Sequence, residues 1–448
     1  MTGHSLTETG VLFGLDPLWL STIILVFTYA VILTEKVHRT VIALFGAGLM
    51  VITGTLTQEQ AFSGIDFNTI ALLTGMMIIV AITRKTGVFE FVAIWSAKKV
   101  KAEPRSVLIV LAVVTAFFSA FLDNLTTVLL ITPVALLIVD KLQISPYPFL
   151  ISQILASNIG GTATLIGDPP NILIGSATGF SFTDFLFTLG PVVLILLILM
   201  VIAFYFAPMK SLKTTAQNRE KIMMFKEADT ITDHRLLKQC LLILFLVVAG
   251  FIIGEHYHIR PGTTAMMGAA MLLLITSIGV DEKSQSTRLH ETLNEVEWPA
   301  LFFFMGLFVI VAGVEHAGLL SILGAKLLEA TGGDQAATAL TTLWLSALIS
   351  ACLDNIPFVA TMIPLVESIA GGLGGSESLT PVWWSLALGA CLGGNGSLIG
   401  AAANVMVAGL SERAGYPLSF TRFAMIGIPV MLITIIIAHA YLYFRFFS

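Results

Sequence analysis

One polar pattern occurs twice in a chain that is otherwise strongly apolar. The pair Asp123-Asn124 recurs 231 positions later as Asp354-Asn355. The glycine pair Gly160-Gly161 recurs as Gly393-Gly394, and a Leu-Ile-Gly run follows each glycine pair. A carboxylate, an amide and a glycine-rich break in the same order predict a duplicated fold. We expect the two copies to build one binding site together.

The sequence around these motifs places both copies in a membrane. Only 11% of the 448 residues are charged, against roughly 25% in soluble globular domains, and the mean hydropathy is +0.92. Many apolar runs approach the 20 or so residues that span a bilayer. The chain is therefore predicted to be an all-α polytopic membrane protein in contact with the lipid bilayer. We expect no nucleic-acid partner and no cofactor.

Each copy is predicted to contain five transmembrane helices and one re-entrant hairpin, about ten spanning helices and two hairpins in all. Two short apolar segments meet at Asp123-Asn124, and their twins meet at Asp354-Asn355. Non-helical backbone at membrane depth is tolerated only where it is buried in protein or lines a cavity, which favours hairpins over four more spans. The predicted division is a first repeat at 1–208, a hydrophilic cytoplasmic linker at 209–238 and a second repeat at 239–448.

The basic residues predict the orientation of the chain. With the N-terminus outside, only Arg260, Lys326 and Arg445 of the 23 Lys and Arg residues lie on outer segments, which is a strong positive-inside bias. An odd number of crossings per copy then inserts the second copy upside down. We expect an inner (plasma) membrane location, both termini outside and no cleavable signal peptide, because Met1 to Asp16 contain no Lys or Arg. Inverted repeats with broken helices are typical of secondary transporters, so an enzyme is not expected.

Three aspartates are the candidate ionisable groups of the site. A carboxylate at membrane depth costs several kcal/mol unless a proton or a cation compensates it, and burial favours the neutral form. Asp123 and Asp354 are therefore predicted to couple protons to transport, although Asp is also a favoured N-cap and the two roles are compatible. Asp168 breaks the symmetry, because its twin position is Ala401. It could titrate, bind a cation or end a half-helix.

Amide, hydroxyl and glycine positions complete the predicted binding site. Asn offers one acceptor and two donors, glycine lets the backbone approach a ligand closely, and half-helix ends present N–H or C=O groups to ions. The alternatives are that the amides satisfy frayed backbone carbonyls and that the glycines serve helix packing. With the three aspartates, the predicted solute or ion ligands are Asn124, Thr126, Gly160, Gly161, Thr162, Thr164, Asn171, Asn355, Gly393, Gly394, Asn395, Ser397 and Asn404.

The three cysteines Cys240, Cys352 and Cys391 form no disulfide framework. Trivalent arsenic and antimony favour soft sulfur ligands, which makes Cys352 and Cys391 candidate metalloid ligands. Buried free Cys is more often a small hydrophobic residue, and these two have no counterpart in the first copy.

These motifs resemble the arsenite-permease/P-protein group of the ion transporter superfamily. The similarity is most specific at Leu122–Pro133, Gly160–Asn171, Leu353–Pro364 and Leu392–Asn404, and is closest to the P-protein branch. The resemblance implies a carrier with re-entrant hairpins from both sides and a central site. Related dicarboxylate carriers have Ser-Asn-Thr at the hairpin tips where this chain has Leu-Asp-Asn, which favours a proton or cation role.

The predicted function is arsenite or antimonite efflux coupled to proton entry, with a small inorganic solute or ion as the substrate. The alternatives are a sodium/proton antiporter, a passive anion channel and, least favoured, an intramembrane aspartyl protease. A homodimer is a further candidate assembly, and family analogy adds an external ATPase subunit.

Overall fold

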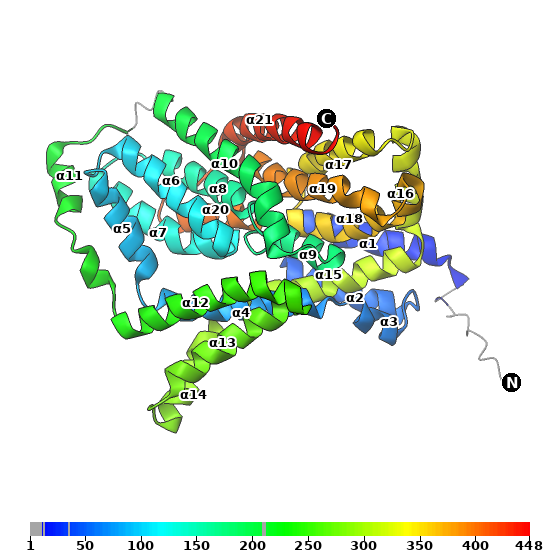
Figure 1. The fold of residues 1–448 in the computed structure, drawn as a ribbon, viewed down its shortest axis with the longest axis horizontal. Coiled ribbons are helices and arrows are strands. Elements are labelled where there is room, and N and C mark those ends of the chain that lie inside the picture. Colours follow the sequence, from blue (N-terminus) through cyan, green and yellow to red (C-terminus); the bar gives the residue numbers. More distant parts are fainter. Residues whose placement is uncertain (1–10, 12–13, 35, 208–211) are drawn as a thin grey trace.

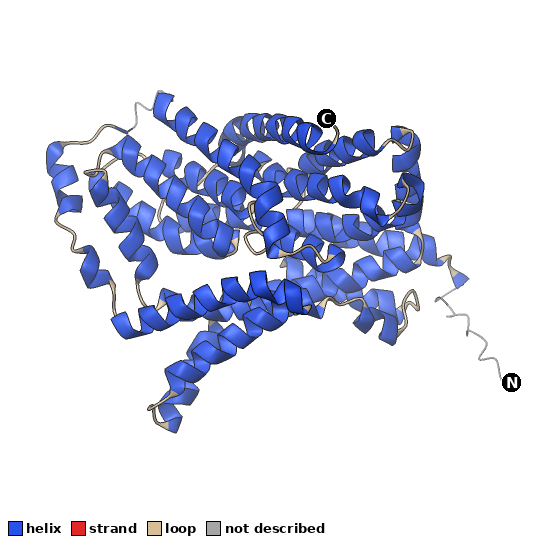
Figure 2. Ribbon diagram, in the orientation of Figure 1, coloured by secondary structure: helices blue, strands red, loops and turns tan. Residues whose placement is uncertain are grey.

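The computed structural model describes residues 11, 14–34, 36–207 and 212–448. Within these residues the chain forms helices and no strands (Figures 1 and 2), which confirms the predicted all-α class. Seven described helices are long and apolar enough to cross a membrane. The predicted boundary between the first repeat and the linker, at 208 and 209, lies outside the described residues.

The first half of the chain contains ten α-helices: α1 (Pro17–Leu33), α2 (Arg39–Ile52), α3 (Gln58–Ser63), α4 (Phe67–Arg84), α5 (Val88–Lys99), α6 (Pro104–Phe121), α7 (Asn124–Leu142), α8 (Tyr147–Gly161), α9 (Pro169–Thr178) and α10 (Phe182–Phe206). The linker carries α11 (Ala216–Met223). The rest of the chain forms α12 (His234–Gly254), α13 (Pro261–Ser277), α14 (Glu282–Asn294), α15 (Trp298–His316), α16 (Leu319–Thr331), α17 (Gln335–Ser350), α18 (Asn355–Ser368), α19 (Thr380–Gly393), α20 (Ala402–Arg413) and α21 (Phe420–Phe446).

The elements follow the same order in both halves. A long apolar helix (α4 or α15) leads to a short helix (α5 or α16), then to a hairpin (α6–α7 or α17–α18), a broken helix (α8–α9 or α19–α20) and a final long helix (α10 or α21). The sequence pattern predicted only the spanning helices and hairpins, whereas the structure adds α5 and α16 as separate helices. Each begins after a glycine in the left-handed region, Gly87 (φ 76°) and Gly318 (φ 87°), where other residues are strained.

The long helices α4 and α15 each pack closely against a helix of the other half. A Cβ on Gly75 of α4 would lie 2.6 Å from the carbonyl carbon of Ala265 on α13. A Cβ on Gly306 of α15 would lie 2.7 Å from the carbonyl carbon of Ala43 on α2. Each glycine is the repeat equivalent of the other, so α4 packs against the second half as α15 packs against the first. Small residues permit such close approach of membrane helices.

The hairpins enter from opposite ends of the molecule. Figure 1 shows α6 and α7 nearer the end that carries α11, and α17 and α18 nearer the end that carries α16. The first arms pack along the broken helices, α6 on α8 and α17 on α19. The second arms contact the other half, α7 on α20 and α18 on α9. This crossed packing brings the two hairpin tips together at the centre of the protein.

Candidate functional site

The aspartate at each hairpin tip begins the second arm of its hairpin. Oδ1 of Asp123 accepts a hydrogen bond from the Thr126 amide at 2.7 Å, and the Thr126 hydroxyl donates to Oδ2. Oδ1 of Asp354 accepts from the Ile356 amide at 3.2 Å. The structure therefore contains the N-caps that were the structural alternative for both residues.

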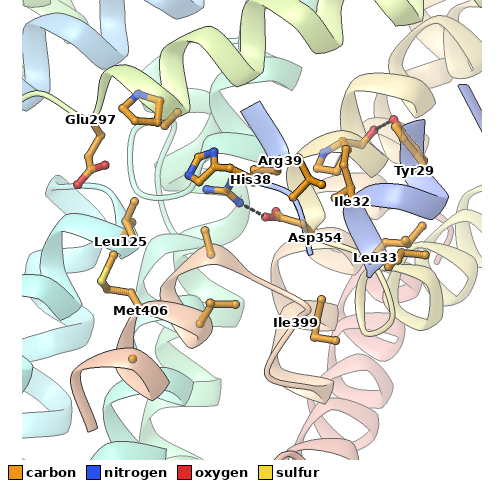
Figure 3. Close-up of a pocket in the computed structure, with 18 of the residues that line it drawn as sticks. Tyr29, Ile32, Leu33, His38, Arg39, Leu125, Glu297, Asp354, Ile399 and Met406 are labelled. Atoms are coloured by element: carbon orange, nitrogen blue, oxygen red, sulfur yellow. Dashed lines mark hydrogen bonds and ion pairs between the residues drawn. The ribbon is translucent and has the colours of Figure 1, made fainter. Parts of the chain in front are cut away.

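Asp354 also forms an ion pair that sequence reasoning missed. Nη1 of Arg39, the first residue of α2, lies 2.5 Å from Oδ2 of Asp354. A dashed line marks this ion pair in Figure 3. The Arg39 guanidinium also lies over the Phe303 ring, 5.1 Å from its centroid. Because 315 positions separate Arg39 from Asp354, the sequence suggested only a cytoplasmic loop charge. No Lys or Arg in the described part of the chain pairs with Asp123 in this way.

A small central cavity lies where the two hairpin tips meet. Its volume is about 20 Å³, close to what one water molecule needs. The lining residues come from both halves and are Arg39, Leu73, Met77, Asp123, Asn124, Leu125, Asp168, Pro169, Ala300, Phe304, Asn355, Ile356 and Ala402. The structure thus brings four predicted site residues together: Asp123, Asn124, Asp168 and Asn355.

A larger pocket of about 480 Å³ adjoins the central cavity. We call this pocket the vestibule; it is lined by Tyr29, Ile32, Leu33, Val37, His38, Arg39, Leu125, Glu297, Pro299, Ala300, Leu353, Asp354, Pro357, Ile399, Ala402, Val405, Met406, Gly409, Leu410 and Arg413 (Figure 3). Arg39, Leu125, Ala300 and Ala402 line both spaces. The Arg39–Asp354 pair therefore stands at the boundary between the vestibule and the central cavity.

Two asparagines close the loops that interrupt the broken helices. Nδ2 of Asn171 donates to the carbonyl oxygens of Thr164 at 2.9 Å and Thr162 at 3.2 Å. Nδ2 of Asn404 donates to those of Gly394 at 2.7 Å and Ser397 at 2.8 Å. Both amides thus satisfy carbonyls freed by the helix breaks, which was the alternative to solute binding. Neither lines the central cavity.

The hydroxyls and glycines of these loops lie against backbone groups. The Thr164 hydroxyl donates to the Ala120 carbonyl, and the Thr162 hydroxyl donates to the Asn158 carbonyl at 2.7 Å. The Ser397 hydroxyl oxygen accepts from the amides of residues 399 and 400. A Cβ on Gly161 would lie 2.5 Å from the carbonyl oxygen of residue 167. The hydroxyls of Thr162, Thr164 and Ser397 are therefore engaged by backbone groups of the loops, of α8 and of α6, and none of the three residues lines the cavity.

A buried asparagine that the sequence analysis did not select links the two halves. Nδ2 of Asn158 donates to Oδ1 of Asn395 at 3.1 Å and to Oδ1 of Asn404 at 3.0 Å. Oδ1 of Asn158 accepts from Nδ2 of Asn124 at 3.3 Å. A polar residue inside the apolar α8 was the available signal, and the equivalent position in the second half is Cys391 rather than a second amide.

Cys391 occupies the position equivalent to Asn158 and makes the corresponding contact. Its thiol lies 3.5 Å from Oδ1 of Asn171, as the amide of Asn158 lies against Asn404. Cys391 is buried and Cys352 is exposed, and neither lines the cavity or the vestibule. Across the residues that the structure describes, no three His, Cys, Asp or Glu side chains gather into a metal-binding group.

Asp168 reaches the cavity without capping its own helix. It stands at the N-cap position of α9, yet its side chain accepts no cap hydrogen bond. Its Oδ1 instead accepts from Nδ2 of Asn355 at 3.3 Å. Asp168 is fully buried. The first half thus supplies the acceptors for both hairpin-tip amides, because Asn158 accepts from Asn124 and Asp168 accepts from Asn355.

Comparisons with known proteins agree with this architecture. Residues 29–389 match the family model described as "Citrate transporter" (CitMHS). The chain is 43% identical over 428 residues to the "Uncharacterized transporter Rv2684" of Mycobacterium tuberculosis, covering 95% of this chain and 97% of that one. It is 32% identical over 504 residues to the human P protein, covering 94% of this chain and 59% of that protein.

A solved structure shares the fold. The crystal structure of the YdaH transporter of Alcanivorax borkumensis superposes with a TM-score of 0.62 at 14% identity, covering 96% of this chain and 99% of that one. The likeness to the P protein is confirmed, whereas the arsenite-permease assignment stays a prediction. The chain therefore belongs to the CitMHS citrate transporter family, as a multi-pass membrane transporter of the CitMHS and P-protein type rather than an enzyme.

Proposed function

We propose that this protein is a proton-coupled secondary transporter that binds its solute between the two hairpin tips. Arsenite or antimonite is the proposed solute, exported against proton entry. One observation carries the proposal: hairpin tips from opposite halves meet at a cavity lined by Asp123, Asn124, Asp168 and Asn355. Coupling requires that protonation favours one facing state of the carrier over the other.

The charge balance of the site supports a neutral solute. Three carboxylates, Asp123, Asp168 and Asp354, lie in or beside the cavity with Arg39 as the one guanidinium that lines it, and Arg39 is already paired with Asp354. A polyanion such as citrate would meet the like charge of Asp123 at short range and would find no free cationic partner among the described residues that line the cavity. Arsenite at neutral pH is a neutral trihydroxy compound, and its hydroxyl groups can donate to carboxylates and accept from amides.

Sodium/proton antiport is the second candidate function. The same carboxylate and amide oxygens of Asp123, Asn124, Asp168 and Asn355 are hard ligands of the kind that alkali and alkaline-earth cations prefer. The description of the family makes citrate a third solute to test, and Arg39 is the side chain that would receive it.

The orientation of the transporter is part of the proposal. The vestibule is lined by His38, Glu297 and Arg413, which lie on segments that the distribution of Lys and Arg assigns to the cytoplasm. The vestibule would then be the cytoplasmic entrance, with both termini on the outer side of the inner membrane.

Flux measurements in proteoliposomes test the function. Purified protein is reconstituted, a pH gradient is imposed, and transport is followed for arsenite, antimonite, sodium and citrate in parallel, with choline as the replacement cation. The expected result is arsenite flux that follows the size and direction of the pH gradient. Gradient-dependent sodium flux without arsenite flux would favour antiport, citrate flux would favour a carboxylate carrier, and no flux of any kind would refute the proposal. Unchanged flux in the double variant Asp123→Asn with Asp354→Asn would show that neither hairpin-tip carboxylate is needed for coupling.

A further inference from the structure

The three aspartates at the centre of the protein differ in what compensates their charge. Asp123 accepts hydrogen bonds from the amide and hydroxyl of Thr126. Asp354 accepts from a backbone amide and from Arg39. The carboxylate of Asp168 accepts from Nδ2 of Asn355, at 3.3 and 3.5 Å, and its other side-chain donor is the neutral thiol of Cys391. Within the described chain, Asp168 is therefore the one of the three that has neither a backbone donor nor a cationic partner.

The surroundings of Asp168 make its ionised form costly. Its side chain is 0% exposed, and the cavity that it lines has room for about one water molecule. A buried charge without a partner is disfavoured by far more than a buried neutral acid, so such a group takes up a proton instead.

The other charged or titratable groups around Asp168 do not alter this balance. Asp123 on the α7 side adds a like charge, and Arg39 on the α2 side is held by Asp354 at the tip of α18. The thiol of Cys391 on α19 faces both Asp168 and Asn171, and α4 contributes apolar side chains, Leu73 and Met77.

Asp168 has no acidic counterpart in the second half of the chain. The position equivalent to Asp168 is Ala401, which is fully buried. The amide of Asn355 therefore crosses to Asp168 in the first half, while the equivalent amide of Asn124 stays within the first half at Asn158. The two repeats together therefore place a single Asp168-type carboxyl group at the central cavity.

We propose that Asp168 is the group that binds the transported proton, whereas Asp123 and Asp354 remain ionised as helix caps. This assignment rests on the proposed function and deepens it. With Asp168 ionised, its two oxygens accept hydrogen bonds from hydroxyl groups of the solute. When a proton from the outer side adds to one of these oxygens, that oxygen becomes a donor and the solute loses an acceptor. Proton and solute therefore exclude each other at Asp168, which yields exchange of one for the other.

Infrared spectroscopy tests the protonation of Asp168 without any solute. A protonated carboxyl group has a carbonyl stretch distinct from the carboxylate bands, and difference spectra between neutral and alkaline pH isolate it in the reconstituted protein. The expected result is a protonated-acid band at neutral pH that disappears in Asp168→Asn, shifts in Asp168→Glu, and persists in Asp123→Asn and Asp354→Asn. The matched control is Asp66→Asn, at an aspartate that caps α4 outside the cavity. A band that survives in Asp168→Asn, or that is absent from the wild type, would overturn the assignment even if the protein transports solute.

Transport assays with sodium arsenite separate coupling from binding. In Asp168→Asn we expect complete loss of flux driven by a pH gradient. Arsenite–arsenite exchange at equal pH should need a higher arsenite concentration, because the amide keeps only one of the two acceptor oxygens, and its rate should no longer vary with pH, because the amide takes up no proton. Retained gradient-driven flux in this variant would overturn the assignment. Absence of both fluxes in the wild type would refute the proposed function and this assignment together. Asp168→Glu, which keeps the acid, should recover part of the gradient-driven flux and shows that the site still folds.

Discussion

Arg39 at the start of α2 and Asp354 at the tip of the second hairpin form an ion pair with a nitrogen–oxygen distance of 2.5 Å. Their side chains are only 29% and 11% exposed. The pair connects α2, which packs against the long helix α15, to a hairpin tip. It also separates the vestibule from the central cavity, because Arg39 lines both. Movement of the hairpin relative to α2 would break this contact.

Removal of the Arg39 charge should destabilise the protein. In Arg39→Gln the Asp354 carboxylate keeps its amide donor but loses its cation. We expect a loss of about 2 kcal/mol, less than the 3–5 kcal/mol of a fully buried pair, because Arg39 is partly exposed. Thermal unfolding in detergent measures the effect.

The exchanged pair, Arg39→Asp with Asp354→Arg, is the control for this prediction. A double-mutant cycle isolates the pairwise energy, and the exchanged pair should be more stable than the sum of the single changes predicts. Additive losses would show that the two residues act independently.

Alanine at Gly160 should prevent the first hairpin from packing on its broken helix. A Cβ at this position would lie 2.2 Å from the Ala116 carbonyl oxygen on α6. Because the obstacle is backbone, no side-chain rotation relieves it, and overpacking of this kind costs about 1–3 kcal/mol or more. Gly393→Ala should act in the same way against Ala347, where the Cβ would lie 2.6 Å from the carbonyl oxygen. Yield of folded protein by size-exclusion chromatography and the melting temperature report both effects.

Gly48→Ala is the matched control for the glycine variants. Gly48 lies inside α2, and a Cβ there would meet nothing within 4 Å. Alanine is favoured over glycine in helices by up to about 1 kcal/mol, so this variant should be as stable as the wild type or more so. A loss equal to that of Gly160→Ala would contradict the packing argument.

Loss of the Asn171 or Asn404 amide should open the loops of the broken helices. Each Nδ2 donates to at least two buried carbonyl oxygens, and a buried polar group left unsatisfied costs about 1–3 kcal/mol. Asn171→Ala and Asn404→Ala should each lower stability by about 3 kcal/mol, measured by thermal unfolding. The exposed Asn294 provides a control, and equal losses in Asn294→Ala would indicate a non-specific effect.

The sequence was sufficient to predict the hairpin tips and the helix breaks, which lie at equivalent positions of the two copies. Asp123 and Asp354 could be placed at hairpin tips because a polar pair between two short apolar segments has few alternatives in a membrane. Their capping bonds are local and follow from residue type. The paired glycines predicted the helix breaks because glycine weakens a helix and lets the backbone turn.

The residues that the sequence analysis missed depend on tertiary contacts. Arg39 meets Asp354 only because α2 packs beside α15 and the second hairpin, and its position near a predicted cytoplasmic loop suggested nothing more. Asn158 pairs with Asn395 and Asn404 across the two halves, which no local pattern encodes. Conversely, Asn171 and Asn404 carried the expected residue type for a solute site, but the nearest carbonyls engage them.

Serine at Cys391 should leave transport intact. The thiol of Cys391 lies 3.5 Å from Oδ1 of Asn171 and corresponds to the amide donor of Asn158 in the first half, so a hydroxyl can replace it as a donor. Cys352 is exposed while Cys240 and Cys391 are buried, and within the described residues no three His, Cys, Asp or Glu side chains gather into a metal-binding group. We therefore expect the double variant Cys352→Ser with Cys391→Ser to retain wild-type arsenite flux, and Cys391→Ala to lose stability because Asn171 loses a donor. If the double variant loses arsenite flux while its melting temperature and sodium flux are unchanged, a thiol binds the metalloid, and the site would have to rearrange to bring that thiol into the cavity.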